Sequence, residues 1–85
     1  MSPNVKEIII PQIGETLEEE VVILQWKKNI GDTVSKDEIL MEVESGKGTV
    51  ELESPYDGVL IEIIIKEGQQ VNPLTVVGRI ESVSI

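Results

Sequence analysis

The sequence contains no cysteine, no histidine and no phenylalanine, and its only aromatic residues are Trp26 and Tyr56. Without cysteine or histidine there can be no disulfide, Cys/His zinc site, thiolate nucleophile or imidazole base. Basic residues are also scarce, because seven Lys and Arg stand against sixteen Asp and Glu, a formal net charge of −9. Binding to nucleic acids or to anionic membrane surfaces is therefore not expected, since both depend on Lys and Arg.

Long apolar runs are absent as well. The longest uncharged stretch, 68–78, is well short of the roughly 18 residues that a membrane span needs. The first residues lack the basic segment and apolar run of a secretion signal. These absences predict a cytoplasmic protein that does not cross a membrane.

The length of 85 residues suits one small domain with a single core. Because aromatic residues are so few, aliphatic side chains must fill that core, and isoleucine alone occupies thirteen positions. We expect one domain over 1–85, with its core over 3–80 and the start of a linker over 81–85.

An internal repeat emerges when the sequence is shifted by 37 residues. Segment 31–45 then lies over 68–82 without a gap, and the apolar residues at 34, 39, 40 and 43 fall on apolar residues at 71, 76, 77 and 80. Upstream, the apolar positions of 22–26 fall on those of 59–63. The repeat predicts two copies of one β-unit related by a pseudo-twofold axis.

Aliphatic and acidic residues alternate on both sides of a short glycine-containing segment. Residues 41–44 and 50–53 alternate between aliphatic side chains and Glu, which is the period of half-buried strands. Between them, 45–49 reads Ser-Gly-Lys-Gly-Thr, and its glycines favour a tight reversal. The same alternation turns the Glu side chains to water and the aliphatic side chains inward, which leaves Lys47 at an exposed hairpin tip.

Turn-forming segments separate the other short runs, at 29–32, 55–58, 66–68 and 72–73. Short strands at regular spacing predict an all-β sandwich or barrel. One alternative stays open, because Thr16 could cap a helix over 16–26, with Glu19 completing a capping box. The β-branched run 21–23 and the repeat favour a strand there instead.

Lys47 is the only basic residue between Asp37 and Asp57, where seven residues are acidic. An amine on a flexible stem, at a hairpin tip between Gly46 and Gly48, is accessible to a modifying enzyme. The alternative is a solvated turn lysine without a function. No nucleophile–base pair occurs at a recognisable spacing, so neither a catalytic site nor a metal site is expected.

Five segments follow one another along the chain: 11–15, 31–34 with Trp26 ahead of it, 40–47, 53–59 and 67–71. In this order and spacing they resemble the lipoyl domain of 2-oxo acid dehydrogenase complexes. The resemblance covers nearly the whole chain. It implies a flattened barrel of two four-stranded antiparallel sheets, and it implies that Lys47, which matches the modified lysine of the family, carries lipoic acid in amide linkage.

By the same resemblance, the domain is a carrier and not itself an enzyme, and its parent chain is a dihydrolipoamide acyltransferase. The lipoyl arm would take acyl groups from a thiamin-diphosphate 2-oxo acid decarboxylase to an acyltransferase core, and a dihydrolipoamide dehydrogenase would reoxidise it. A lipoate ligase would attach the group. The isolated domain is expected to be a monomer.

The resemblance also implies which residues the partner proteins recognise. One group is the loop of Gly14, Glu15 and Thr16, which lies near the lysine hairpin in lipoyl domains. The other group surrounds the lysine and comprises Glu44, Ser45, Gly46 and Gly48. Trp26 is expected to pack in the core rather than to bind a ligand.

The chain departs from the family beside the lysine. Most lipoyl domains have Asp before the modified lysine and often Ala after it, whereas here Gly46 and Gly48 occupy these positions. Three alternatives remain: a biotinyl carrier, whose lysine usually lies between two methionines; a glycine-cleavage carrier, whose Glu-Ser-x-Lys stretch 44–47 resembles; and an unmodified acidic β-sandwich that binds other proteins.

Overall fold

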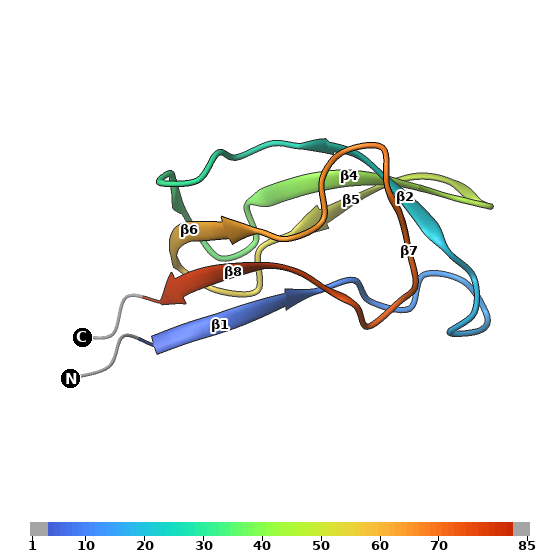
Figure 1. Ribbon diagram of the computed structural model, residues 1–85, viewed down its shortest axis with the longest axis horizontal. Coiled ribbons are helices and arrows are strands. Elements are labelled where there is room, and N and C mark those ends of the chain that lie inside the picture. Colours follow the sequence, from blue (N-terminus) through green and yellow to red (C-terminus); the bar gives the residue numbers. More distant parts are fainter. Residues whose placement is uncertain (1–3, 83–85) are drawn as a thin grey trace.

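The computed structural model describes residues 4–82 and contains eight β-strands (Figure 1). They are β1 (Asn4–Ile9), β2 (Val21–Trp26), β3 (Thr33–Val34), β4 (Ile39–Ser45), β5 (Gly48–Glu53), β6 (Gly58–Ile63), β7 (Gln70–Val71) and β8 (Val76–Ser82). Residues 4–82 contain no helix, and so none that could cross a membrane. The expected all-β class is confirmed.

The alternative of a capped helix over 16–26 is wrong, because 21–26 form β2. The hydroxyl of Thr16 accepts a hydrogen bond from the Glu18 N–H at 3.2 Å, which closes a local turn and starts no helix. β8 continues through Ser82, two residues beyond the expected core boundary. The remaining residues of the expected linker, 83–85, lie outside the described part of the chain.

The strands form two four-stranded antiparallel sheets. The first has the order β1-β8-β6-β3 and the second the order β5-β4-β2-β7. The buried side chains between the sheets are nearly all aliphatic: Ile8, Ile10, Val21, Ile23, Trp26, Val34, Leu40, Met41, Val43, Leu60, Val71, Val77 and Ile80. Each large aliphatic side chain buried in this way stabilises the fold by roughly 1.5–3 kcal/mol.

The 37-residue repeat is present in the structure. When the sequence is shifted by 37 residues, strands β2, β3 and β4 align with β6, β7 and β8. The aligned strands have the same lengths and nearly the same pattern of buried and exposed residues. The Gly31 N–H donates to the Leu60 carbonyl and the Gly68 N–H to the Ile23 carbonyl, both at 2.7 Å, and these four positions are equivalent. The shift therefore exchanges the two sheets, as a pseudo-twofold axis requires.

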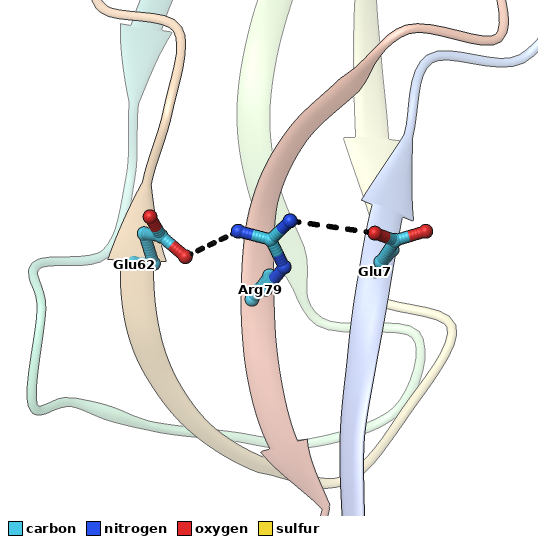
Figure 2. A network of polar contacts seen from close by, with 3 residues as sticks. All are labelled: Glu7, Glu62 and Arg79. Atoms are coloured by element: carbon cyan, nitrogen blue, oxygen red, sulfur yellow. Dashed lines mark hydrogen bonds and ion pairs between the residues drawn. The ribbon is translucent and has the colours of Figure 1, made fainter.

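One arginine links three strands on the outer face of the first sheet (Figure 2). Arg79 on β8 lies between Glu62 on β6 and Glu7 on β1 and forms an ion pair with each. The hydrogen bond and the charge of Glu62 raise the pKa of Arg79 above its ordinary value. The guanidinium thus separates two carboxylates that would otherwise repel each other across β8.

Two glycines allow the strands of the first sheet to approach closely. A β-carbon on Gly58 would lie 2.2 Å from the carbonyl oxygen of Glu81, and one on Gly78 would lie 2.7 Å from that of Glu62. Both neighbours are backbone atoms of the adjacent strand. They can move only if the pairing of β6 with β8 is distorted.

We therefore expect Gly58→Ala to lower the free energy of unfolding by about 1–3 kcal/mol, since the added methyl overpacks the sheet. Gly46→Ala is the matched control, because no atom lies within 4 Å of its β-carbon position and its φ is ordinary. That control should change stability by less than about 0.5 kcal/mol. Urea unfolding measures both, and equal effects would contradict the close approach.

Candidate functional site

Lys47 lies at the tip of the hairpin formed by β4 and β5, as the alternation predicts. Ser45 pairs with Gly48, so the reversal consists of Gly46 and Lys47 alone and is tighter than the expected 45–49 segment. Gly48 has a φ of +117°, a conformation that favours glycine. The Lys47 side chain is exposed and takes part in no ion pair within residues 4–82.

The hairpin is held by its aliphatic face. Val43 is fully buried, and Val50 and Leu52 pack against the core from β5. The exposed Glu44 confirms that glutamates face outward. Glu42 deviates from this, because it is half-buried and pairs with Lys27 at 3.5 Å. The tip therefore projects from a support that is fixed by core packing.

The hydroxyl of Ser45 organises the turn from within. Its oxygen accepts a hydrogen bond from the Lys47 N–H and donates one to the carbonyl of Gly48, each at 3.1 Å. The sequence pointed to Ser45 only through the family resemblance. These two bonds give it a physical role at the lysine.

The other end of the hairpin is tied to the turn that precedes β4. The Asp37 N–H donates to the Ser54 carbonyl, and the Ser54 N–H donates to the Glu38 carbonyl, both at 2.7 Å. Ser54 is buried, and its hydroxyl donates to the Tyr56 carbonyl at 2.6 Å. Sequence reasoning missed Ser54, although its position directly before Pro55 and the turn was the available signal.

The turn preceding β4 also contains a perturbed carboxyl group. Hydrogen bonds from the Lys28 ammonium, at 2.7 Å, and from the Ser35 N–H, at 2.9 Å, lower the pKa of Glu38 below its ordinary value. Both bonds favour the ionised form. The carboxylate of Glu38 thus helps to hold the chain where it enters β4.

The loop of Gly14, Glu15 and Thr16 connects β1 to β2 at the same end of the molecule as the hairpin tip (Figure 1). It is locally ordered, because the Gln12 side-chain amide donates to the Gly14 carbonyl at 3.1 Å. Glu19 folds over Gly14, and its carboxylate occupies the space that a β-carbon on this glycine would fill.

The pairing of β2 with β4 brings the end of this loop beside the tip. Val22 pairs with Glu44, so the chain just before β2 continues toward the 45–48 turn. Within residues 4–82 no hydrogen bond or ion pair joins the 14–16 loop to that turn. The exposed carboxylates on the loop and beside the lysine are Glu15, Glu18, Glu19, Glu20 and Glu44.

Trp26 lies in the core, as expected, and is only 9% exposed. Its indole N–H donates to the Ile65 carbonyl at 2.9 Å, and its backbone N–H donates to a carboxylate oxygen of Glu67 at the same distance. Trp26 is also one of the residues that line a surface hollow, at the end of β2 that pairs with Met41 and not at the end beside the tip. Trp26 is therefore a packing residue.

Two pairs of adjacent glycine and aspartate, Gly31-Asp32 and Asp57-Gly58, serve the turns in which they occur. The Asp32 carboxylate accepts the Asn29 N–H at 2.8 Å, and that of Asp57 accepts the Lys36 N–H at 2.7 Å. In the described part of the chain, no three carboxylates gather in a way that could hold a metal ion.

A small two-sheet domain with one exposed lysine on a two-residue hairpin turn is the architecture of a carrier domain for a covalently bound group. Similarity to known proteins agrees with this architecture. A family model described as "Biotin-requiring enzyme", which covers biotin and lipoyl attachment, matches residues 6–80. The chain belongs to this family of biotin- and lipoyl-attachment domains.

Proteins similar to the chain include dihydrolipoyllysine-residue succinyltransferases. The chain is 43% identical over 76 residues to the dihydrolipoyllysine-residue succinyltransferase component of the 2-oxoglutarate dehydrogenase complex of Bartonella vinsonii, covering 89% of this chain and 18% of that protein. The same component of Buchnera aphidicola is 37% identical, over 96% of this chain and 20% of that protein. The chain thus spans about a fifth of the length of these curated relatives.

A solved structure supports the same assignment. The lipoyl domain of the 2-oxoglutarate dehydrogenase complex of Azotobacter vinelandii matches with a TM-score of 0.70 and 28% identity, over 87% of this chain and 92% of that one. Together these matches identify the chain as a lipoyl-type carrier domain.

The lowered pKa of Glu38 predicts a pH-dependent contribution to stability. An ionised Glu38 stabilises the fold above its unfolded pKa, near its ordinary value of 4.5, and this contribution is lost as the pH falls through the lower folded value. Glu38→Gln should therefore unfold at a slightly lower temperature than the wild type near neutral pH, and the two midpoints should converge in acid.

Thermal unfolding followed from about pH 7 to about pH 2 measures this difference. Glu53→Gln is the control, because Glu53 is an exposed carboxylate with no ion pair within residues 4–82. If the unfolding temperatures of Glu38→Gln and the wild type differed by the same amount at every pH, the ion pair of Glu38 would not be the source of that difference.

Proposed function

We propose that Lys47 carries lipoic acid in amide linkage, and that the domain passes acyl groups and reducing equivalents between the active sites of a 2-oxo acid dehydrogenase complex. The position of Lys47 carries this proposal, because its side chain is exposed at the tip of a rigid hairpin. The parent chain is then an acyltransferase component in the cytoplasm.

The surroundings of Lys47 suit covalent attachment. Apart from the adjoining residues, no atom lies within 4 Å of a β-carbon placed on Gly46 or Gly48, so both sides of the lysine are open to an enzyme. No ion pair in the described residues holds the amine. A bound lipoyl group would supply a dithiolane that accepts acyl groups and electrons, while the chain's residues supply orientation and reach.

The shape of the domain suits a carrier. The start of β1 and the end of β8 lie at one end of a molecule 41 Å long and 20 Å wide, and the hairpin tip between β4 and β5 lies at the other (Figure 1). A lysine at the tip can thus enter a partner's site while the chain ends remain outside it. Tethering in this way replaces free diffusion by a high effective concentration.

Lipoate is favoured over biotin by the relatives and by the neighbours of the lysine. The similar proteins described above are named dihydrolipoyllysine-residue succinyltransferases, and the lysine here lies between glycines and not between methionines. The substrate is proposed only as a 2-oxo acid and no single acid is named, because the relatives include components of both 2-oxoglutarate and pyruvate dehydrogenase complexes.

The proposed partners are a thiamin-diphosphate decarboxylase, the acyltransferase core, a dihydrolipoamide dehydrogenase and a lipoate ligase. Acylation of Lys47 removes the only positive charge of the tip and leaves Glu44 and the acidic 15–20 segment around it. Basic entrances to the partners' active sites would complement this end of the molecule. The proposed contacts are Gly14, Glu15, Thr16, Glu44, Ser45, Gly46 and Gly48.

Attachment at Lys47 predicts one defined change in mass. Incubation with lipoate, ATP and a lipoate ligase should add a single lipoyl group, because one lysine lies on the hairpin tip. Lys47→Arg should abolish the addition, whereas Lys66→Arg, the control at another exposed lysine, should leave it unchanged. Intact-mass spectrometry measures the product, and gain of biotin with a biotin ligase would instead support the biotinyl alternative.

The glycine before the lysine predicts slow modification by a ligase that recognises an Asp-Lys pair. Gly46→Asp should raise the lipoylation rate several-fold, because it adds the missing carboxylate at a position with space for a side chain. Gly46→Asn is the uncharged control and should show a smaller effect. Equal rates for the wild type and Gly46→Asp would contradict the role of the carboxylate.

A further inference from the structure

The turn that presents Lys47 receives no support from the side chains next to it. Gly46 and Gly48 have none, and glycine retains more backbone freedom than any other residue. A lysine between two glycines would therefore sample many backbone conformations, and a modifying enzyme would have to restrict them when it binds. Any order in the turn has to come from other contacts.

The Ser45 hydroxyl provides such contacts. It accepts the Lys47 N–H and donates to the Gly48 carbonyl, each at 3.1 Å, so one side chain bonds to the backbone on both sides of the lysine. Ser45 is the last residue of β4 and is half-buried. Its own position is fixed by the paired strands, and the two bonds extend that order into the turn.

We propose that Ser45 is a positioning residue for the modification of Lys47, which rests on the proposed attachment of lipoate there. By holding the backbone of Lys47 and Gly48, its hydroxyl presents the lysine to the ligase in one conformation. The reaction itself joins the Lys47 Nζ, as the free amine, to the carbonyl carbon of a lipoyl adenylate, which the ligase forms from lipoate and ATP with release of pyrophosphate. AMP leaves, and the amine's proton passes to solvent.

The test compares Ser45→Ala with Ser45→Thr in lipoylation by a lipoate ligase. Loss of the two hydrogen bonds should lower kcat/KM roughly three- to tenfold in Ser45→Ala, whereas Ser45→Thr retains a hydroxyl and should stay within about twofold of the wild type. Amide hydrogen exchange at Lys47 should become faster in the alanine variant, with little change in the exchange of the core strands.

A second substitution separates local positioning from general stability. Gly46→Ala restricts the turn and has space for its methyl group, so it should restore part of the lost kcat/KM when added to Ser45→Ala. Lipoylation of Ser45→Ala at the wild-type rate would overturn the inference. So would a slower rate that follows a lower unfolding temperature and is not restored by Gly46→Ala.

Other results would disprove the proposed attachment of lipoate itself. If the wild-type domain gains no lipoyl group, or gains one that Lys47→Arg does not abolish, attachment at Lys47 is disproved irrespective of Ser45. If the wild type is modified at Lys47 and the serine variants all react equally, the attachment stands and only the positioning role is disproved.

Discussion

The antiparallel pairing of β4 with β5 is the constraint on which the exposed lysine depends. Strands present alternate residues to opposite faces, so the burial of Val43 turns Glu44 to water and fixes where the chain must reverse. A slip of one residue would exchange the two faces and expose the aliphatic side chains. Backbone bonds between Ser54 and the turn before β4 hold the other end of the hairpin in register.

The duplication explains why the lysine and the chain ends lie far apart. The 37-residue shift places β4 on β8, so the end of β4 that continues into the hairpin turn corresponds to the end of β8 at Ser82. A pseudo-twofold axis puts these equivalent positions at opposite ends of an elongated molecule (Figure 1). The separation that a tethered carrier requires thus follows from the symmetry of the fold.

Two requirements conflict at the tip. Open space around Lys47 gives an enzyme access, and the flanking glycines provide it, but the same glycines weaken the order of the backbone. A single hydroxyl that bonds to both sides of the lysine reconciles the two, because it acts from the base of the turn and leaves the exposed side free.

The sequence by itself determined the strands, the repeat and the exposure of Lys47, because period-two alternation and glycine-rich reversals are local properties of the chain. Local patterns also left a helix possible at Thr16, which the pairing of β2 with β4 and β7 excluded. Only the tertiary structure revealed the roles of Ser54 and Gly58 and the two bonds of Ser45, whereas the place of the 14–16 loop at the lysine's end was indicated beforehand only by the family resemblance. These features depend on distances between segments far apart in sequence or on the conformation of one turn, and residue types in order do not specify either.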